Sequence, residues 1–123
     1  MCVRIATAVL GMLMFSSVAV AQDAKPFDPV GLWRFHHTDG SAFHGWLKPD
    51  QTATTDFDGG ERGIWRWEGQ RVRVYYTDGW DDVLYAAAGV YRKAGYAPDA
   101  DRCGPASNDT VAEKVSGDPA AKP

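Results

Sequence analysis

The stretch that decides the fold is residues 63–86, which read GIWRWEGQRVRVYYTDGWDDVLYA. Large apolar residues alternate with polar residues along it, which is the period of a β-strand that buries one face. Two turn signals, Gly69-Gln70 and Asp78-Gly79, divide the stretch into three strands. Consecutive strands that share one buried face and are joined by short turns predict an antiparallel meander.

The register of these three strands follows if each turn is a two-residue loop. The inner face then carries the opposite pairs Trp67–Val72, Trp65–Val74, Val74–Val83 and Val72–Tyr85. On the outer face, Glu68 lies opposite Arg71, which has the complementary charge. The alternative, a first loop at Glu68-Gly69, loses both the Trp–Val pairs and this charge pair, so we prefer the first register.

Alternating segments on both sides extend this sheet. Strands are expected over residues 30–37, 42–47 and 52–57, and a short one over residues 90–93. Residues 22–29 form a lead-in, and residues 97–123, where the periodicity is lost, read as a loop and a partly disordered tail. The predicted fold is all-β: a single antiparallel meander of six to eight strands over residues 30–96, curled into a small barrel or half-barrel, with an irregular C-terminal tail.

The inner face of this meander has two different ends if Asp39-Gly40 and Pro49-Asp50 are also two-residue loops. One end is apolar and holds Trp33, Trp46, Ala53, Trp67, Val72 and Tyr85. The other end holds polar groups and two rings, namely His37, His44, Thr55, Tyr76 and Asp81 with Phe57 and Trp65. Because an unpaired buried polar group costs about 1–3 kcal/mol, this end is expected to be a ligand-binding recess backed by the two rings. The alternative is that His44 and Asp81 only cap an open barrel end.

Residues 1–21 have the pattern of an export signal. Arg4 precedes an uncharged apolar run, and Ala19-Val20-Ala21 fits the small-x-small cleavage rule. The run of about 16 residues is shorter than the ~20 that span a bilayer, which disfavours a transmembrane anchor. We expect a mature chain that begins at Gln22, has no membrane span and is exported to a periplasm or out of the cell. Cys2 precedes the apolar run and therefore cannot be a lipoprotein's lipidated cysteine.

Charge and cysteine content bound the partners. Removing 21 of the 123 residues leaves 102, with 12 basic and 16 acidic side chains and a net charge of −4. A chain without a basic stripe is not expected to bind nucleic acid. The mature chain would keep one cysteine, Cys103, which excludes a disulfide within it and allows a homodimer linked through Cys103.

The start of the first strand carries a family resemblance. Gly31-Leu32-Trp33 resembles the Gly-x-Trp start of lipocalin-like and avidin-like barrels, over residues 30–93 of this chain. Those families use eight strands to enclose a ligand. Six clear strands and one short strand favour a shallow cup, or an interior filled by its own tryptophans, over a deep cavity.

No motif predicts catalysis or a cofactor. His37 and His44 would be diagonal neighbours, with Asp81 as a third metal ligand, but their spacing matches no strong metal motif. The sequence also has no nucleophile elbow, paired-carboxylate motif or phosphate loop. We expect no cofactor, no metal and no enzymatic activity.

Two functions are therefore considered. The first is an exported binding module for a small ring-bearing or partly apolar ligand, such as a glycan fragment or a lipid-like metabolite. The alternative is an envelope or periplasmic accessory protein that has no pocket function. It would bind another protein through an outer face formed by Arg66, Arg71, Arg73, Tyr75 and Trp80.

Overall fold

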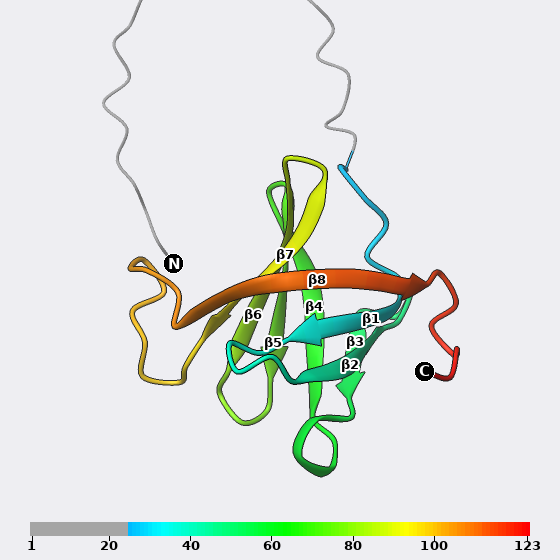
Figure 1. Ribbon diagram of the computed structural model, residues 1–123, viewed down its shortest axis with the longest axis horizontal. Helices are drawn as coiled ribbons and strands as arrows, with labels where there is room; N and C mark the ends of the chain where they lie inside the picture. Colours follow the sequence, from blue (N-terminus) through cyan, green and yellow to red (C-terminus); the bar gives the residue numbers. More distant parts are fainter. Residues whose placement is uncertain (1–24) are drawn as a thin grey trace, which may run out of the picture.

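The computed structural model describes residues 25–123, so the expected export signal lies outside the described residues (Figure 1). The elements in chain order are β1 (Gly31–His36), β2 (Ala42–Leu47), β3 (Thr52–Thr55), the 3₁₀ turn η1 (Phe57–Gly59), β4 (Arg62–Glu68), β5 (Arg71–Tyr76), β6 (Asp81–Ala87), β7 (Val90–Tyr96) and β8 (Asn108–Ser116). Nothing in this described part of the chain forms a helix suited to crossing a membrane.

Each strand pairs antiparallel with the next, and β8 pairs back onto β1 to close a barrel. Figure 1 shows β8, in orange, running alongside β1. The predicted all-β meander and its curling into a small barrel are confirmed. Closure also removes the open sheet edges on which other chains could pair.

The prediction of a loop and a partly disordered tail over residues 97–123 is wrong at β8, which is a regular strand. The hydrophobic pattern does not reveal this strand because its two valines, Val111 and Val115, point outward and are 39% and 50% exposed. The inward positions of β8 carry small or polar side chains, of which Ala112 is buried. Backbone pairing with β7 and β1, and not an apolar face, therefore defines this strand.

The predicted register is right at one turn and wrong at three others, and the residues in each turn explain the difference. The two-residue loop at Gly69-Gln70 is confirmed, with Trp65 opposite Val74 and Trp67 opposite Val72. The three loops that contain an aspartate are one residue longer than predicted, as the backbone bonds His37 N–Ser41 O, Lys48 N–Thr52 O and Tyr76 N–Trp80 O show. These loops carry Asp39, Asp50 and Asp78 at their centres.

The aspartates themselves explain the extra residue. In each loop a carboxylate oxygen accepts the backbone N–H two residues later, at 2.9 Å for Asp39, 3.0 Å for Asp50 and 3.0 Å for Asp78. The residue between them adopts a positive φ, as Gly79 does at 95°. A type I turn followed by a left-handed residue is the usual three-residue hairpin loop.

This one-residue shift turns β2 and β6 over. Phe35 pairs with Phe43 and not with His44, so His44 and Trp46 face outward. Val74 pairs with Asp82 and not with Val83, so Asp82 faces inward while Asp81 and Tyr85 face outward. The shifts at the two ends of β2 cancel at β3, which keeps its predicted face.

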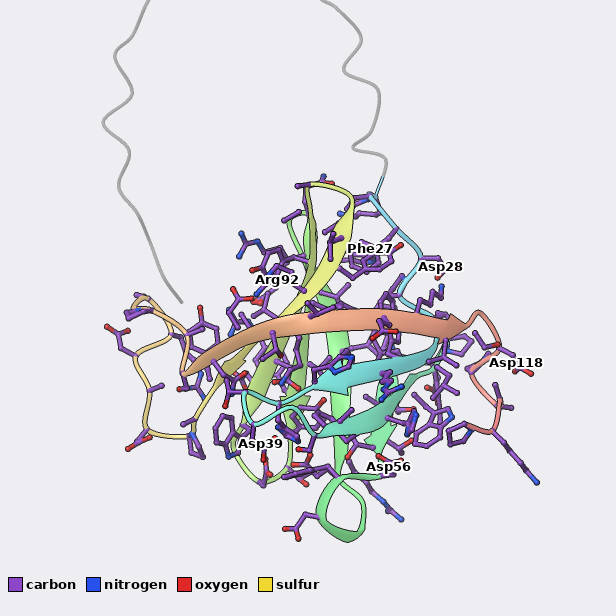
Figure 2. All side chains as sticks on the ribbon, viewed as in Figure 1. Phe27, Asp28, Asp39, Asp56, Arg92 and Asp118 are labelled. Carbon is purple, nitrogen blue, oxygen red and sulfur yellow. The ribbon has the colours of Figure 1, made fainter. Side chains whose placement is uncertain are left out.

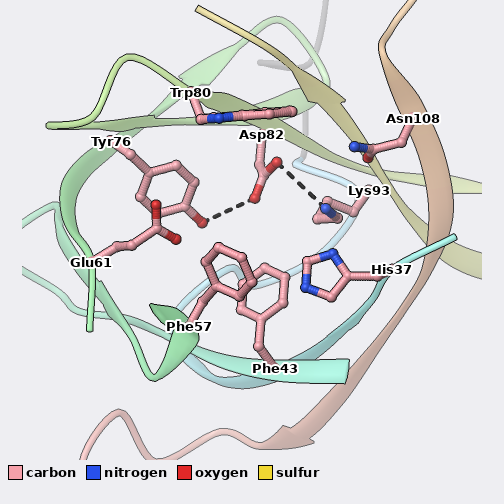
Figure 3. A pocket seen from close by; sticks show the side chains of 9 residues that line it. All are labelled: His37, Phe43, Phe57, Glu61, Tyr76, Trp80, Asp82, Lys93 and Asn108. Carbon is pink, nitrogen blue, oxygen red and sulfur yellow. Dashed lines mark hydrogen bonds and ion pairs between the residues drawn. The ribbon is translucent and has the colours of Figure 1, made fainter. Parts of the chain in front are cut away.

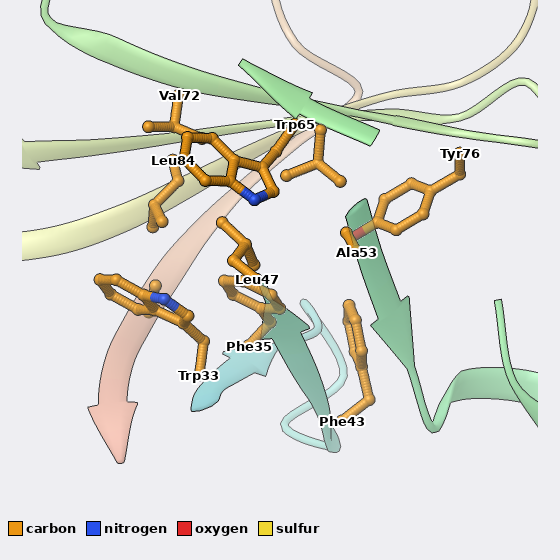
Figure 4. Close-up of a cluster of buried hydrophobic side chains, with 11 residues drawn as sticks. Trp33, Phe35, Phe43, Leu47, Ala53, Trp65, Val72, Tyr76 and Leu84 are labelled. Atoms are coloured by element: carbon orange, nitrogen blue, oxygen red, sulfur yellow. The ribbon is translucent and has the colours of Figure 1, made fainter. Parts of the chain in front are cut away.

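The barrel interior is filled in its middle by buried apolar side chains that include Trp33, Phe35, Leu47, Val72, Val74 and Leu84 (Figure 4). The lead-in plugs one end, where Phe27 packs against Trp33, Trp67 and Tyr91 with ring centroids 6.0, 5.2 and 5.4 Å away. In an antiparallel meander, alternate turns lie at opposite ends. The β1–β2, β3–β4, β5–β6 and β7–β8 connections therefore share the other end, where Asp39 and Asp56 lie far from Phe27 (Figure 2).

Candidate functional site

A pocket of about 250 Å³ opens at the end of the barrel that Phe27 does not plug. Its lining consists of His37, Phe43, Phe57, Glu61, Tyr76, Trp80, Asp82, Lys93 and Asn108 (Figure 3). Figure 3 shows Trp80 across the pocket from Phe43 and Phe57, with Asp82, Lys93, Asn108 and His37 in an arc between them. The pocket is thus a slot with aromatic walls and a polar inner edge.

Three buried side chains with polar groups, Asp82, Lys93 and Tyr76, interact at this inner edge. Asp82 and Lys93 are only 5% and 3% exposed, and Lys93 Nζ lies 3.6 Å from Asp82 Oδ1. The Tyr76 hydroxyl donates to Asp82 Oδ2 at 3.0 Å. Burial raises the pKa of Asp82, and the charge of Lys93 and the Tyr76 hydrogen bond oppose that rise. Burial, together with the Asp82 charge, also holds the pKa of Tyr76 well above its usual value.

Two polar atoms at this end have no hydrogen-bond partner within the described part of the chain. They are His37 Nε2 and Asn108 Oδ1, and both are buried. The His37 ring lies 4.9 Å from the Phe43 ring and 5.0 Å from the Phe57 ring. An unpaired buried polar atom is costly, so each calls for an explanation.

The place of Asn108 depends on a glycine in the neighbouring strand. Gly95 on β7 pairs with Asn108 on β8. A Cβ atom at Gly95 would come within 2.6 Å of Asn108 Oδ1, a distance that real Cβ contacts do not reach. The absence of a side chain at residue 95 therefore makes the room in which the Asn108 amide lies.

Carboxyl groups line the rim of the pocket. Burial and a hydrogen bond to Asp78 raise the pKa of Glu61 to about 8. The same hydrogen bond lowers the pKa of Asp78. At neutral pH the pair therefore holds one proton, on Glu61. Thr55 fixes this rim from behind, since its hydroxyl accepts the backbone N–H groups of Phe57 and Glu61 at 3.2 Å each.

Four of the seven predicted site residues lie at or near this pocket, and Trp65 does not. His37, Phe57 and Tyr76 line it. Thr55 is buried behind the rim, and Trp65 belongs to the apolar core, where its indole N–H donates to the Lys48 carbonyl at 2.8 Å.

The predictions for His44 and Asp81 are wrong because both lie on strands that the longer loops turn over. His44 faces outward, with Nδ1 at 2.9 Å from Asp56 Oδ2. Asp81 is held outside the barrel by Arg102 at 2.9 Å and Arg73 at 3.4 Å. Neither side chain lines the pocket.

The sequence reasoning missed six lining residues: Phe43, Glu61, Trp80, Asp82, Lys93 and Asn108. Correct three-residue loops would have turned Phe43 and Asp82 inward. Lys93 lies on the short strand expected over residues 90–93, whose inner face the sequence does not predict. Asn108 lies on β8, which the sequence pattern does not indicate. Trp80 was assigned to the outer face, and the structure instead places it in the pocket wall.

The outer arginines are engaged by neighbouring side chains. Arg66 donates to the Tyr75 hydroxyl at 2.9 Å, and Arg73 donates to Glu68 at 2.8 Å. The Arg71 guanidinium lies 4.6 Å from the centre of the Tyr85 ring.

Within residues 25–123, no three His, Cys, Asp or Glu side chains gather closely enough to hold a metal ion.

Comparison with known proteins found no matching family model, no matching curated protein and no matching solved structure.

Proposed function

We propose that this protein is an exported, non-enzymatic binding module whose pocket holds a small ring-bearing or partly apolar ligand. One observation carries the proposal: the same pocket combines aromatic walls with buried polar atoms that the described chain leaves unpaired. Ligand sites are typically built in this way, because rings supply contact area and a few polar groups set orientation. Export rests on the pattern of residues 1–21.

The size of the pocket limits the ligand. At about 250 Å³ it is smaller than a typical site for a drug-sized molecule, which is about 300–1,000 Å³. A single substituted ring, such as the terminal sugar of a glycan fragment or the head of a lipid-like metabolite, is of suitable size. The aromatic side chains of Trp80, Phe43 and Phe57 around the pocket suit a ring.

The polar inner edge is difficult to explain as a feature of folding alone. A buried ion pair such as Asp82–Lys93 is often no more stabilising than apolar side chains of similar volume. Each unpaired buried polar atom costs about 1–3 kcal/mol in addition. A barrel selected for stability alone would fill this end with apolar residues, as it fills its middle.

Binding is preferred to catalysis because the pocket offers no activated nucleophile. His37 Nε2, the natural candidate for a base, has no hydrogen-bond partner among the described residues. A nucleophile activated by a base would lie within about 2.6–3.2 Å of it.

Tryptophan fluorescence tests this proposal. Single-ring sugars, phenols and cyclic alcohols are titrated into the mature protein while its tryptophan emission, to which Trp80 in the pocket wall contributes, is followed. The Phe57→Ala variant should weaken binding about 2- to 10-fold, since a ring–ring contact contributes about 0.5–1.5 kcal/mol. Ile64→Ala is the matched control, because Phe57 and Ile64 are both apolar and exposed, at 40% and 55%, and Ile64 lies outside the pocket. If no ring compound changes the emission, or both variants weaken binding equally, the proposal is wrong.

A further inference from the structure

We propose that the inner edge of the pocket recognises the hydroxyl groups of an uncharged ring, with Lys93 Nζ donating, Asn108 Oδ1 accepting and His37 Nε2 contacting a further hydroxyl. The inference rests on the proposed function and specifies its ligand class as a neutral polyhydroxylated ring, such as a pyranose sugar.

The charges on the inner edge of the pocket are balanced, which disfavours an ionic ligand there. Asp82 and Lys93 carry opposite charges and lie 3.6 Å apart. Burial and a hydrogen bond to Asp78 raise the pKa of Glu61, the third charged side chain in the lining, to about 8, so the Glu61–Asp78 pair holds one proton at neutral pH. A cationic ligand would compete with Lys93 for Asp82, and an anionic ligand would place a second negative charge beside Asp82. Both would also have to give up hydration, and the one charge that Lys93 does not neutralise is the single negative charge of the Glu61–Asp78 pair at the rim, away from the inner edge.

The unused hydrogen-bonding capacity defines what the ligand must offer. An ammonium group has three donors, whereas within residues 25–123 Lys93 Nζ is paired with Asp82 and otherwise lies 5.4 Å from the centre of the Phe43 ring. Asn108 Oδ1 needs a donor, and His37 Nε2 can donate or accept according to its tautomer. A carbonyl could accept from Lys93 but could not donate to Asn108, and an ammonium could donate to Asn108 but could not accept from Lys93. A hydroxyl accepts and donates at once, so neighbouring hydroxyls on one ring can satisfy all three groups.

The shape of the pocket agrees with this chemistry. A pyranose ring has apolar C–H faces and a rim of hydroxyls. The faces can pack against the aromatic side chains of the lining, and the rim can then meet the arc of Lys93, Asn108 and His37 (Figure 3). Gly95 adds to the argument, because a glycine within a strand weakens it and here makes room for the unpaired Asn108 amide.

The test compares six-membered rings of similar size by calorimetry at pH 7. The polyhydroxylated probes are myo-inositol and the methyl pyranosides of glucose, galactose and mannose. The comparison probes are cyclohexanol, cyclohexanecarboxylate, cyclohexylammonium and δ-valerolactam, which offer one hydroxyl, an anion, a cation and an amide. At least one polyhydroxylated ring should bind about tenfold more tightly than every comparison probe, as expected for one or two added hydrogen bonds to a charged or buried partner.

Substitutions link this preference to the inner edge. Asn108→Ala should weaken the polyhydroxylated ring about tenfold and change cyclohexanol binding less than twofold. Its free form should melt no lower than the wild type, because an unpaired acceptor has been removed. Gln70→Ala, which removes an exposed side-chain amide from the β4–β5 turn, is the control and should change neither affinity.

The outcomes separate the two proposals. If cyclohexanol, a charged ring or the lactam binds as tightly as the best sugar, and Phe57→Ala weakens that binding, the pocket function stands and the hydroxyl-recognition proposal is overturned. If sugars bind best but Asn108→Ala leaves their affinity unchanged, the recognition proposal is likewise overturned. If no ring binds, the proposed function falls and this inference falls with it.

Discussion

Removing the carboxylate of Asp82 should destabilise the protein more than removing any charged group at its surface. In Asp82→Ala the Lys93 ammonium stays buried without its counter-charge, and the Tyr76 hydroxyl loses its acceptor. Breaking a buried ion pair costs about 3–5 kcal/mol. Because Nζ and Oδ1 are 3.6 Å apart, longer than a hydrogen bond of normal length, we expect the lower part of that range.

A loss of about 3 kcal/mol is large for a barrel of this size. A domain of this length has a total stability of about 5–15 kcal/mol, and each kcal/mol lost lowers its melting temperature by about 4–8 °C. The melting temperature of Asp82→Ala should therefore fall by more than about 10 °C. Urea unfolding followed by circular dichroism gives the free energy directly.

The double variant Asp82→Leu with Lys93→Met isolates the pair. Replacing both charges by apolar groups of similar size is often neutral or stabilising, so its stability should lie within about 2 kcal/mol of the wild type, the Tyr76 hydroxyl accounting for part of any loss. The cycle is completed by the single variants Asp82→Leu and Lys93→Met. Its coupling energy should exceed about 2 kcal/mol. Additive effects, with a coupling below about 0.5 kcal/mol, would refute the buried pair.

Three further predictions concern Glu61 at the pocket rim, strand β8 and the loop of residues 97–107. Stability should fall by about 1–2 kcal/mol between pH 5 and 8, because the folded protein raises the pKa of Glu61 from 4.5 to about 8 and so keeps a proton that the unfolded chain has released. Urea unfolding at several pH values should show a flatter profile for Glu61→Gln, and an equally steep one would contradict this assignment. Ala112→Asp, which buries a charge in β8, should prevent stable folding, whereas Val115→Asp on the exposed face should shift the melting temperature by less than about 3 °C; equal effects would mean that β8 does not close the barrel. Arg102 donates to Asp81 and to the carbonyls of residues 79, 97 and 100, so Arg102→Ala should speed amide exchange in residues 97–107 about tenfold and leave β4 unchanged, and unchanged exchange in that loop would show that these bonds do not hold it.

How far the sequence specified the fold can be seen at its turns. The alternation around Gly69-Gln70 predicts the correct register because that loop has the two residues that the turn signal indicates. At Asp78 the carboxylate accepts the N–H of Trp80 and fixes a three-residue loop, which the dipeptide Asp-Gly alone does not reveal. The one added residue shifts the register of β6, so Asp82 and not the predicted Asp81 faces the interior.

The remaining site residues depend on contacts between distant parts of the chain. Asn108 reaches the pocket only because β8 closes the barrel and Gly95 leaves it room, and neither fact leaves a trace in local periodicity. Lys93 looks like a surface residue in the sequence, and its burial follows from Asp82 on the adjacent strand. Pairing of this kind is fixed by the tertiary structure, so hydrophobic pattern alone could not locate the polar inner edge.

NMR chemical-shift mapping of the tryptophan indole groups tests most directly the central claim that a ring-shaped ligand binds in this pocket. Trp80 lies in the pocket wall, whereas the indole N–H groups of Trp33 and Trp46 donate to the carbonyls of Pro29 and Ala121, away from the pocket. When the best-binding ring is added to ¹⁵N-labelled mature protein, the Trp80 indole and the Asn108 side-chain amide should shift in a saturable manner, while Trp33 and Trp46 stay in place. Saturable shifts at Trp46 with none at Trp80 or Asn108 would contradict a ligand site at this end of the barrel.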